Sequence, residues 1–537
     1  MDPKRLGSLF ASRLSFARTF LRKMTREGWK IELSLQDLDS RGFGHCVYEL
    51  HGLKGLYSLV IYSNELQDDE RTDRVVARKW DVACALCLGK VTASRIAELE
   101  PHVTQQEYGR FDHSVLVLSR ANKSVSAFQR AVDQLQSSNG DWHWLLDRGY
   151  LLRTSAVYGN NKFGIAPFEH LAETDLATPF LGQMAVVYLL REFSMHLVEH
   201  IASHAAKAPC HLPLGVKSGL GVGNATGLGM VTFIYRHPGL IHQWIHARES
   251  IRQEIGCLVP TLSEWRKLAS LMEGAMVHLE QATVKDLEQS LQTETIMREL
   301  SRIRELLSDQ ADAIGEWQGL LRQIEESFSV ATEELVVNLL MEIYPDLSDP
   351  MEHHMGAQES FELDPLMTLG ELRQKIEDSY QWVLGSPGLV PGSRTRYWYS
   401  SVDKMEPSFC HHSLENPVLG EPLAFDGPEK IMALYGIMKI WPEESLVKDL
   451  IEANPQFKAI ICRVQNVGHL AYGELRGNLM GDDTSPLDWL RLKLAFLGAQ
   501  KFDPQSERWI RVTFFQGAPL ANRWEPESPW WSLSQQV

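Results

Sequence analysis

A glycine-rich segment, residues 219–229, has the composition of a binding site for an anion. It reads Gly-Leu-Gly-Val-Gly-Asn-Ala-Thr-Gly-Leu-Gly and leads into an apolar stretch that predicts a helix over 225–236. Backbone N–H groups without neighbouring Cβ atoms can converge on a phosphate or carboxylate, and a helix N-terminus favours negative charge. The binding residues predicted here are Gly223, Asn224, Thr226 and Gly227. Close helix packing is the alternative, because the spacing matches no nucleotide-binding loop.

A second polar segment, residues 153–164, reads Arg-Thr-Ser-Ala-Val-Tyr-Gly-Asn-Asn-Lys-Phe-Gly. We interpret it as the end of a helix followed by a glycine-hinged loop. Arginine binds a carboxylate or phosphate through two parallel hydrogen bonds, and lysine supplies a compact positive charge. The residues expected to contact an anion are Arg153, Tyr158, Asn161 and Lys162. A solvent-exposed Gly-Asn turn is the alternative.

The third polar feature is Asn122, at the flank of the apolar face of a helix predicted over 115–135. A buried amide needs a hydrogen-bonding partner, although a surface patch with one tolerated Asn is the simpler interpretation. Together the three features suggest an enzyme acting on a small carboxylated or phosphorylated metabolite in a pocket of helices. Its catalytic residues would be Lys162, Arg153, Tyr158 and Asn122, and its substrate-binding residues Asn161, Gly223, Asn224, Thr226 and Gly227. The sequence identifies no cofactor.

Histidines at helical spacing suggest a second hypothesis, a metal-dependent enzyme. The segment His196-Leu-Val-Glu-His200 has the order of the inverted zinc peptidases, with His204 one turn further on, and His242 and His246 repeat the spacing. Two histidines four residues apart on a helix can ligate one metal ion. We favour a polar stripe with no metal, because so short a motif arises easily by chance in a chain with 19 His.

The composition excludes several classes of protein. The chain has 537 residues and a formal net charge of −16, so its surface repels nucleic acids and anionic membranes. No run of about 18–20 apolar residues predicts a membrane span. Seven scattered cysteines, with Cys84 and Cys87 interpreted as core residues, fit a reducing compartment, and we expect a cytoplasmic protein.

The hydrophobic patterns predict a mainly α protein with α+β ends. We expect an α+β region over 1–112, a helical domain over 113–345, a linker over 346–365 and a mixed C-terminal domain over 366–537. A small antiparallel sheet near the N-terminus is expected from four strand-like runs, residues 29–38, 44–51, 56–63 and 75–91. Helices are expected at 178–190, with Thr178 as N-cap, and at 239–254, 261–281, 369–384, 429–441, 445–452 and 489–497, and strands at 395–401 and 509–515.

A heptad pattern runs through residues 296–335. Apolar residues alternate steps of three and four with one polar member; they are Leu300, Ile303, Leu307, Gln310, Ile314, Trp317, Leu321, Ile324, Phe328, Ala331 and Leu335. Such a seam needs a partner helix. It predicts either one long helix or a hairpin that breaks near 309–315. Packing within the chain is the favoured interpretation, with a homo-oligomer contact, and hence a non-enzymatic scaffold, as the alternative.

Overall fold

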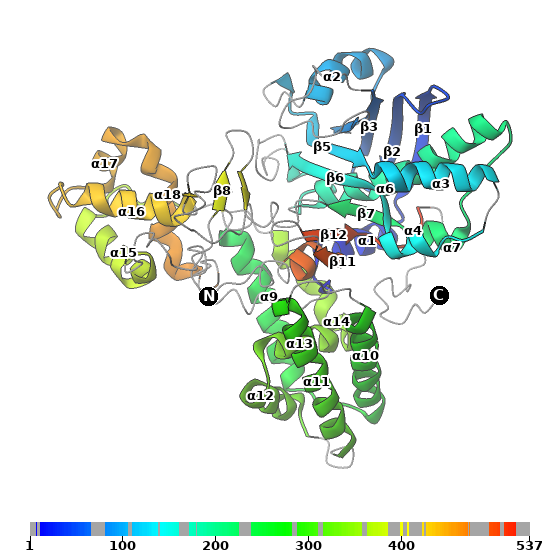
Figure 1. Ribbon diagram of the computed structural model, residues 1–537. Helices are drawn as coiled ribbons and strands as arrows, with labels where there is room; N and C mark the ends of the chain where they lie inside the picture. Colours follow the sequence, from blue (N-terminus) through cyan, green and yellow to red (C-terminus); the bar gives the residue numbers. More distant parts are fainter. Residues whose placement is uncertain are drawn as a thin grey trace, which may run out of the picture. The chain divides into compact units, whose positions relative to one another are not determined.

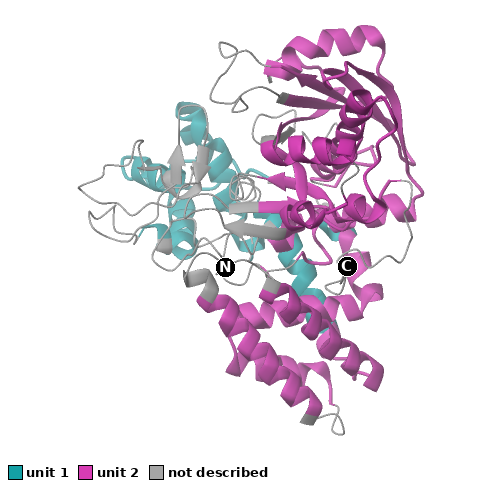
Figure 2. Cartoon of the chain, turned by 45° about the vertical axis from the view of Figure 1, so that its right-hand side comes forward, with its two compact units in different colours: residues 1–6, 228–254, 353–492 teal, residues 7–227, 255–352, 493–537 magenta. Residues whose placement is uncertain are grey.

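The fold was analysed in a computed structural model of the chain. The structure describes residues 7, 11–65, 81–105, 110–137, 140–159, 171–178, 180–224, 238–281, 287–309, 315–356, 362–384, 398–400, 405–407, 422–423, 426–470, 472, 493–504 and 510–521. The chain forms two compact units, and neither is continuous in sequence (Figure 2). Unit 1 comprises residues 1–6, 228–254 and 353–492, and unit 2 comprises residues 7–227, 255–352 and 493–537.

A nine-stranded sheet, assembled from described residues, is the centre of unit 2 (Figure 1). Every neighbouring pair of strands is antiparallel except β6 and β7. In spatial order the strands are β1 Lys30–Leu38, β2 Gly44–His51, β3 Leu56–Asn64, β4 Asp81–Leu88, β5 Val115–Lys123, β6 Tyr150–Gly159, β7 Gly221–Asn224, β12 Ile510–Phe514 and β11 Ala499–Pro504. The four strands expected near the N-terminus are confirmed. The sheet is not small, however, because five later strands extend it.

Three segments that the sequence predicts to be helices or helix ends are strands. Asn122 lies on β5, Arg153 and Tyr158 lie on β6, and Gly223 and Asn224 end β7 where a helix start was expected. The cause of the error is burial. Residues 115–121 of β5 are all buried, and a strand buried on both faces reads as a continuous apolar run that resembles a buried helix. The helix expected at 225–236 lies outside the described residues.

Helices cover both faces of the sheet. Adjacent residues of a strand point to opposite faces, and Leu118 on β5 packs with Leu99 on α2, whereas Val117 faces Gly182 on α6. The helices in this part of unit 2 are α1 Phe16–Arg26, α2 Ala93–Gln105, α3 Val125–Ser137, α4 His143–Arg148, α6 Leu181–Ala206 and α7 Leu214–Gly219. As predicted, α6 is buried on all sides through Leu190. Its N-cap is Phe180 in the left-handed conformation, not Thr178.

The heptad-patterned segment forms part of a helical bundle in unit 2. The bundle helices are α10 Leu262–Gln281, α11 Leu287–Asp309, α12 Trp317–Ser327 and α13 Val330–Ile343. The alternative of one long helix is wrong, because α11 ends at Asp309 and Gly315 is not helical. The break lies where the hairpin alternative expects it, but α11 packs with α10 and α13, and a second break at residues 328–329 separates α12 from α13. Seven seam residues are at most 2% exposed within this one chain: Leu300, Ile303, Leu307, Trp317, Leu321, Ile324 and Leu335. Trp317 stacks on Trp265 with ring centroids 5.1 Å apart. The seam is therefore occupied by intrachain packing.

Unit 1 holds a small helical core of its own. Its helices are α9 Pro238–Gly256, whose last two residues belong to unit 2, α15 Leu369–Leu384, α16 Asp426–Met438, α17 Val447–Ala453, η5 Pro455–Phe457, α18 Lys458–Asn466 and η6 Val467–His469. Three short strands, β10 Pro422–Leu423, β8 Trp398–Ser400 and β9 Met405–Pro407, form a second sheet. Helices expected near 239–254, 369–384, 429–441 and 445–452 are confirmed.

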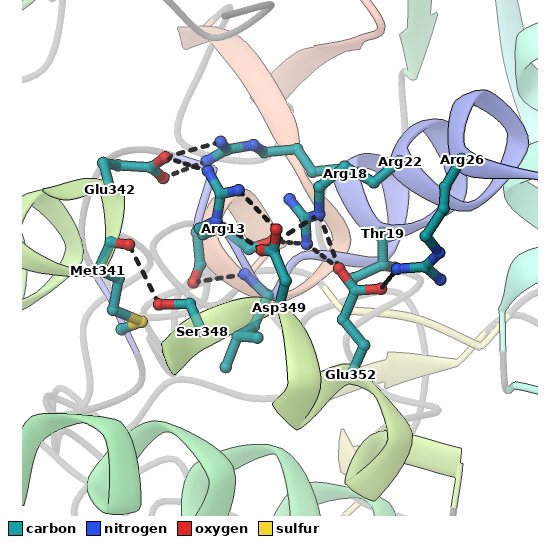
Figure 3. Close-up of polar contacts among 12 residues, drawn as sticks. Arg13, Arg18, Thr19, Arg22, Arg26, Met341, Glu342, Ser348, Asp349 and Glu352 are labelled. Carbon is teal, nitrogen blue, oxygen red and sulfur yellow. Dashed lines mark hydrogen bonds and ion pairs between the residues drawn. The ribbon is translucent and has the colours of Figure 1, made fainter. Parts of the chain in front are cut away.

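A network of ion pairs joins the N-terminal segment of unit 2 to the end of its helical bundle (Figure 3). Four arginines take part, Arg13, Arg18, Arg22 and Arg26, with three carboxylates, Glu342, Asp349 and Glu352. Arg18 Nη1 lies 2.5 Å from Glu342 Oε1, with the two side chains only 4% and 3% exposed. Glu342 lies in α13, and Asp349 and Glu352 lie in η4 Asp349–Gly356, which follows α14 Pro345–Ser348. Part of the expected linker is therefore helical.

The charges of this network shift one another's titration. Burial lowers the pKa of Arg18 to about 10, although Glu342 opposes the shift. Burial tends to raise the pKa of Asp349, but the hydrogen bond and positive charge of Arg13, with Arg22, hold it below its usual value. Arg18 therefore remains charged at neutral pH, in a place where an unpaired charge would be costly.

We predict that Glu342→Ala destabilises the protein by about 3–5 kcal/mol, because it leaves the buried Arg18 guanidinium without its carboxylate. The matched control is Glu273→Ala, which removes a 62% exposed partner of Arg304 and should cost less than about 1 kcal/mol. Urea denaturation of both variants measures the difference. Equal midpoints for the two variants would show that the buried network does not stabilise the fold.

Candidate functional site

A cavity of about 170 Å³ lies beside α6 in unit 2. We call it the α6 cavity and define it by its lining residues, Ile31, Leu33, Tyr48, Glu192, Met195, His196, Lys217, Leu520 and Ala521. They come from β1, β2, α6, α7 and the turn that follows β12. Four of these side chains are ionisable and the others are apolar. A small apolar cavity with a few convergent polar groups is the usual form of a small-molecule site.

Arg191 holds three of these elements together. Its guanidinium is fully buried and donates hydrogen bonds to five backbone carbonyls, those of Lys217, Ser218, Leu220, Ala518 and Pro519. Two of the distances are 2.5 Å to Leu220 O and 2.7 Å to Ala518 O. Because the carbonyls belong to α7, its end and the turn after β12, the guanidinium places cavity residues from distant parts of the chain against α6.

Tyr48 and His196 form a hydrogen-bonded pair inside the cavity. Tyr48 Oη lies 2.6 Å from His196 Nδ1, and the two rings are stacked 6° from parallel. Burial raises the pKa of Tyr48 well above its usual value, so the phenol keeps its proton. Burial lowers the pKa of His196 and favours the neutral imidazole. Both groups are therefore neutral, and the bond has two forms: the tyrosine hydroxyl donates to Nδ1 and His196 carries its proton on Nε2, or Nδ1–H donates to the hydroxyl and Nε2 is unprotonated.

Glu192 is a buried carboxylate of the cavity wall. Its Oε1 is buried and has no hydrogen-bond partner in the described part of the chain, and its closest cation, Arg191 Nη1, is 3.7 Å away. Burial raises the pKa of Glu192, against the opposing charges of Arg191 and Lys217 and a hydrogen bond from the Ala521 backbone. An oxygen of this kind is costly unless something pairs with it.

Lys217 is the cation of the cavity wall, and it is already paired. Its Nζ lies 2.7 Å from Glu199 Oε1, and the same oxygen accepts a hydrogen bond of 2.7 Å from the backbone of Leu212. Glu199 therefore ties α6 to α7 and to the segment that precedes it. The positive charge of Lys217 is largely neutralised before any ligand arrives.

The sheet brings four of the predicted site residues together. In strand register, Asn122 lies opposite Arg153, and Arg153 lies opposite Gly223. Asn224 is buried and donates to Thr154 Oγ1 over 2.9 Å. The backbone of Tyr158 continues β6. Asn161, Lys162, Thr226 and Gly227 lie outside the described residues. Of the four predicted residues whose side chains the structure describes, Asn122, Arg153, Gly223 and Asn224, none lines the α6 cavity.

The histidines of the metal hypothesis have other partners. His200 lies between Gln36 Nε2 and the backbone carbonyl of Asp39, 2.8 Å from each, and His204 Nδ1 lies 2.9 Å from the carbonyl of His200. In unit 1, His242 stacks on His246 and on Tyr472. Within the part of the chain that the structure describes, no three His, Cys, Asp or Glu side chains converge as metal ligands. Cys84 and Cys87 are buried on β4, as expected of core residues.

Sequence reasoning missed Tyr48, Glu192 and Lys217 as site residues. A signal was present for one of them, because Glu192 follows directly on the apolar run that predicts a buried helix. A carboxylate in such a helix needs an internal partner. Tyr48 carries no comparable signal, since an aromatic residue in a strand is ordinary core composition.

No family model matches this chain, and no curated protein or solved structure is significantly similar to it. Among the helices in the described ranges, none is both long and apolar enough to cross a membrane.

We predict that His196 makes the protein less stable in acid. Its folded-state pKa lies below the usual 6.5, so stability is complete above that pH and is lost as the pH falls, by up to about 1.4 kcal/mol per pH unit. Glu199 opposes this shift and Lys217 adds to it. In urea denaturation between pH 7 and 5, His196→Gln should flatten the decline, whereas the exposed His143→Gln should not. Parallel declines in both variants would refute the assignment.

Proposed function

We propose that this chain is an enzyme that binds a small polar molecule in the α6 cavity and transfers a proton through His196. One observation carries the proposal. Three ionisable side chains whose pKa values burial displaces, Tyr48, Glu192 and His196, line the same cavity. Groups perturbed in this way gather at functional sites more often than elsewhere.

The Tyr48–His196 pair supports the acid–base role. When Nδ1–H donates to tyrosine, the neutral imidazole presents an unprotonated Nε2, which has no hydrogen bond to any described residue and can accept a proton from a ligand. The imidazolium that forms would return this proton from Nε2 to the product, while Tyr48 holds the ring in place. General acid–base catalysis of this kind contributes about 10²–10⁴-fold to a rate.

The size of the cavity restricts the ligand. A volume of about 170 Å³ is comparable to the roughly 150 Å³ cavity in another protein that binds benzene. The apolar part of the wall, Ile31, Leu33, Met195 and Leu520, suits a short carbon chain or one ring. We therefore propose a ligand of a few carbon atoms with one or two polar groups.

Filling the cavity should abolish binding. Ala521→Leu adds apolar volume at the cavity wall and keeps the backbone N–H that faces Glu192, whereas Ala205→Leu makes the same change at an exposed position of α6. The probes are butylamine, butyrate, butanol and imidazole. We expect at least one probe to raise the unfolding temperature of the wild type and of Ala205→Leu, but not that of Ala521→Leu. At a concentration of a hundred times Kd, a bound probe stabilises the folded state by about 2.7 kcal/mol. Identical responses of the three proteins would refute the proposal.

The register of β5, β6 and β7 favours a second candidate function, the binding of a small anion by the residues predicted from the sequence. Arg153 stands between Asn122 and Gly223 on neighbouring strands, and an arginine next to an amide is a common anion-binding pair. Lys162 would add the second positive charge.

For the anion candidate, Lys162→Met should weaken the binding of inorganic phosphate about tenfold, because it removes one charge-assisted hydrogen bond. Lys448→Met, at an exposed position of unit 1, is the matched control. Isothermal titration calorimetry on the full chain gives the two dissociation constants. Unchanged phosphate binding in Lys162→Met would exclude Lys162 from any anion site.

A further inference from the structure

The charged groups around the α6 cavity are paired unevenly. The positive charge of Arg191 is surrounded by five carbonyls, and Lys217 is bound to Glu199 at 2.7 Å. Glu192 is different, since its Oε1 has no hydrogen-bond partner among the described residues and its nearest cation is 3.7 Å away. Of Arg191, Glu192 and Lys217, Glu192 is thus the one that lacks a close partner.

We infer that the ligand of the α6 cavity is a small primary amine, bound as its ammonium ion by the carboxylate of Glu192. The inference rests on the proposed function, because it names the class of molecule that the same cavity takes. An ammonium group supplies the hydrogen-bond donor that Glu192 Oε1 lacks, together with a positive charge closer than that of Arg191. Charge-assisted hydrogen bonds of this kind are the strong ones in protein sites.

The remaining walls fit the rest of such a molecule. Leu33, Met195 and Leu520 offer apolar surface to a short carbon chain, and the Tyr48 ring provides an aromatic face. His196 Nε2 can form a hydrogen bond with a polar group elsewhere on the molecule. The wall offers no equivalent site for a carboxylate, because Lys217 is committed to Glu199 and Glu192 would repel a second negative charge.

The pH dependence of binding follows from the same groups. Arg191 from α6, Lys217 from α7 and the Ala521 backbone lower the pKa of Glu192, but burial prevails and raises it. His196 and Tyr48, which line the same cavity, are neutral at pH 7. Since the carboxylate must be ionised to hold an ammonium ion, amine affinity should fall as the pH is lowered through the raised pKa of Glu192.

The experiment compares butylamine with butanol and butyrate, which share its carbon chain, by isothermal titration calorimetry on the full chain. Wild type should prefer butylamine, and Glu192→Gln should weaken that binding about tenfold or more without changing the binding of butanol. Glu173→Gln, the same change at an exposed position, should behave as wild type. Glu192→Gln is expected to fold, because burial already disfavours the charged carboxylate; Glu192→Asp, which keeps the charge, should retain part of the preference for the amine.

Three results would overturn the inference, and they are distinguishable. Tighter binding of butyrate or butanol than of butylamine, with no loss in Glu192→Gln, would refute the amine while leaving the α6 cavity as a ligand site. Indifference of wild type and Ala521→Leu to every probe would refute the proposed function and the amine together. Butylamine binding that is equal in wild type, Glu192→Gln and Ala521→Leu would place the amine elsewhere and refute Glu192 as its anchor.

Discussion

The fully buried guanidinium of Arg191 is the constraint on which the rest of unit 2 depends. Five carbonyls converge on it, from residues 217–220 and from residues 518–519. A buried arginine without these acceptors would cost several kcal/mol, and carbonyls turned inward without a donor would also be costly. Each therefore requires the other. The β7 strand begins directly after the first group of carbonyls and the second follows β12, so this one side chain sets where two late strands join the sheet.

The ion pairs of Arg13, Arg18 and Arg22 also give buried charges their partners, and they join segments that are further apart in the sequence. They connect the start of the chain to residues 342–352, more than three hundred positions away. Within unit 2 they join the sheet, on which α1 packs through α6, to the helical bundle that ends in α13. Exposed ion pairs contribute little to stability, but Arg18 and Glu342 are buried, and their loss from either side would leave an unpaired charge. These ion pairs thus help to hold the helical bundle and the sheet together within unit 2.

The parts of the fold that local pattern determines are predictable, and the parts that depend on distant partners are not. Strands β1 to β3 are short β-rich runs separated by turns, and α10, α11 and α15 show amphipathic periodicity, so the sequence alone indicates them. Strand β5 is buried on both faces, and its apolar run has no period that excludes a helix. Strand β7, Gly-Val-Gly-Asn, has poor strand propensity and exists because β6 and β12 flank it. The hypothesis of an anion site was built on helices predicted where β5 and β7 lie. Its described residues on β5, β6 and β7 are nevertheless neighbours in the sheet.

The α6 cavity could not be predicted from the sequence either, because its residues come from distant segments. One of those segments, α6, nevertheless shows a pattern that points to a site. Helix α6 is apolar through Leu190 and then carries Arg191, Glu192, His196 and Glu199 while remaining buried. A buried helix cannot send these groups to water, so each must find a partner inside the protein. Arg191 finds carbonyls, His196 finds Tyr48 and Glu199 finds Lys217, and Glu192 alone of these four is left without a hydrogen bond on one oxygen. The onset of charge within a buried helix therefore indicates a site, and the member that stays unsatisfied indicates what the ligand must supply.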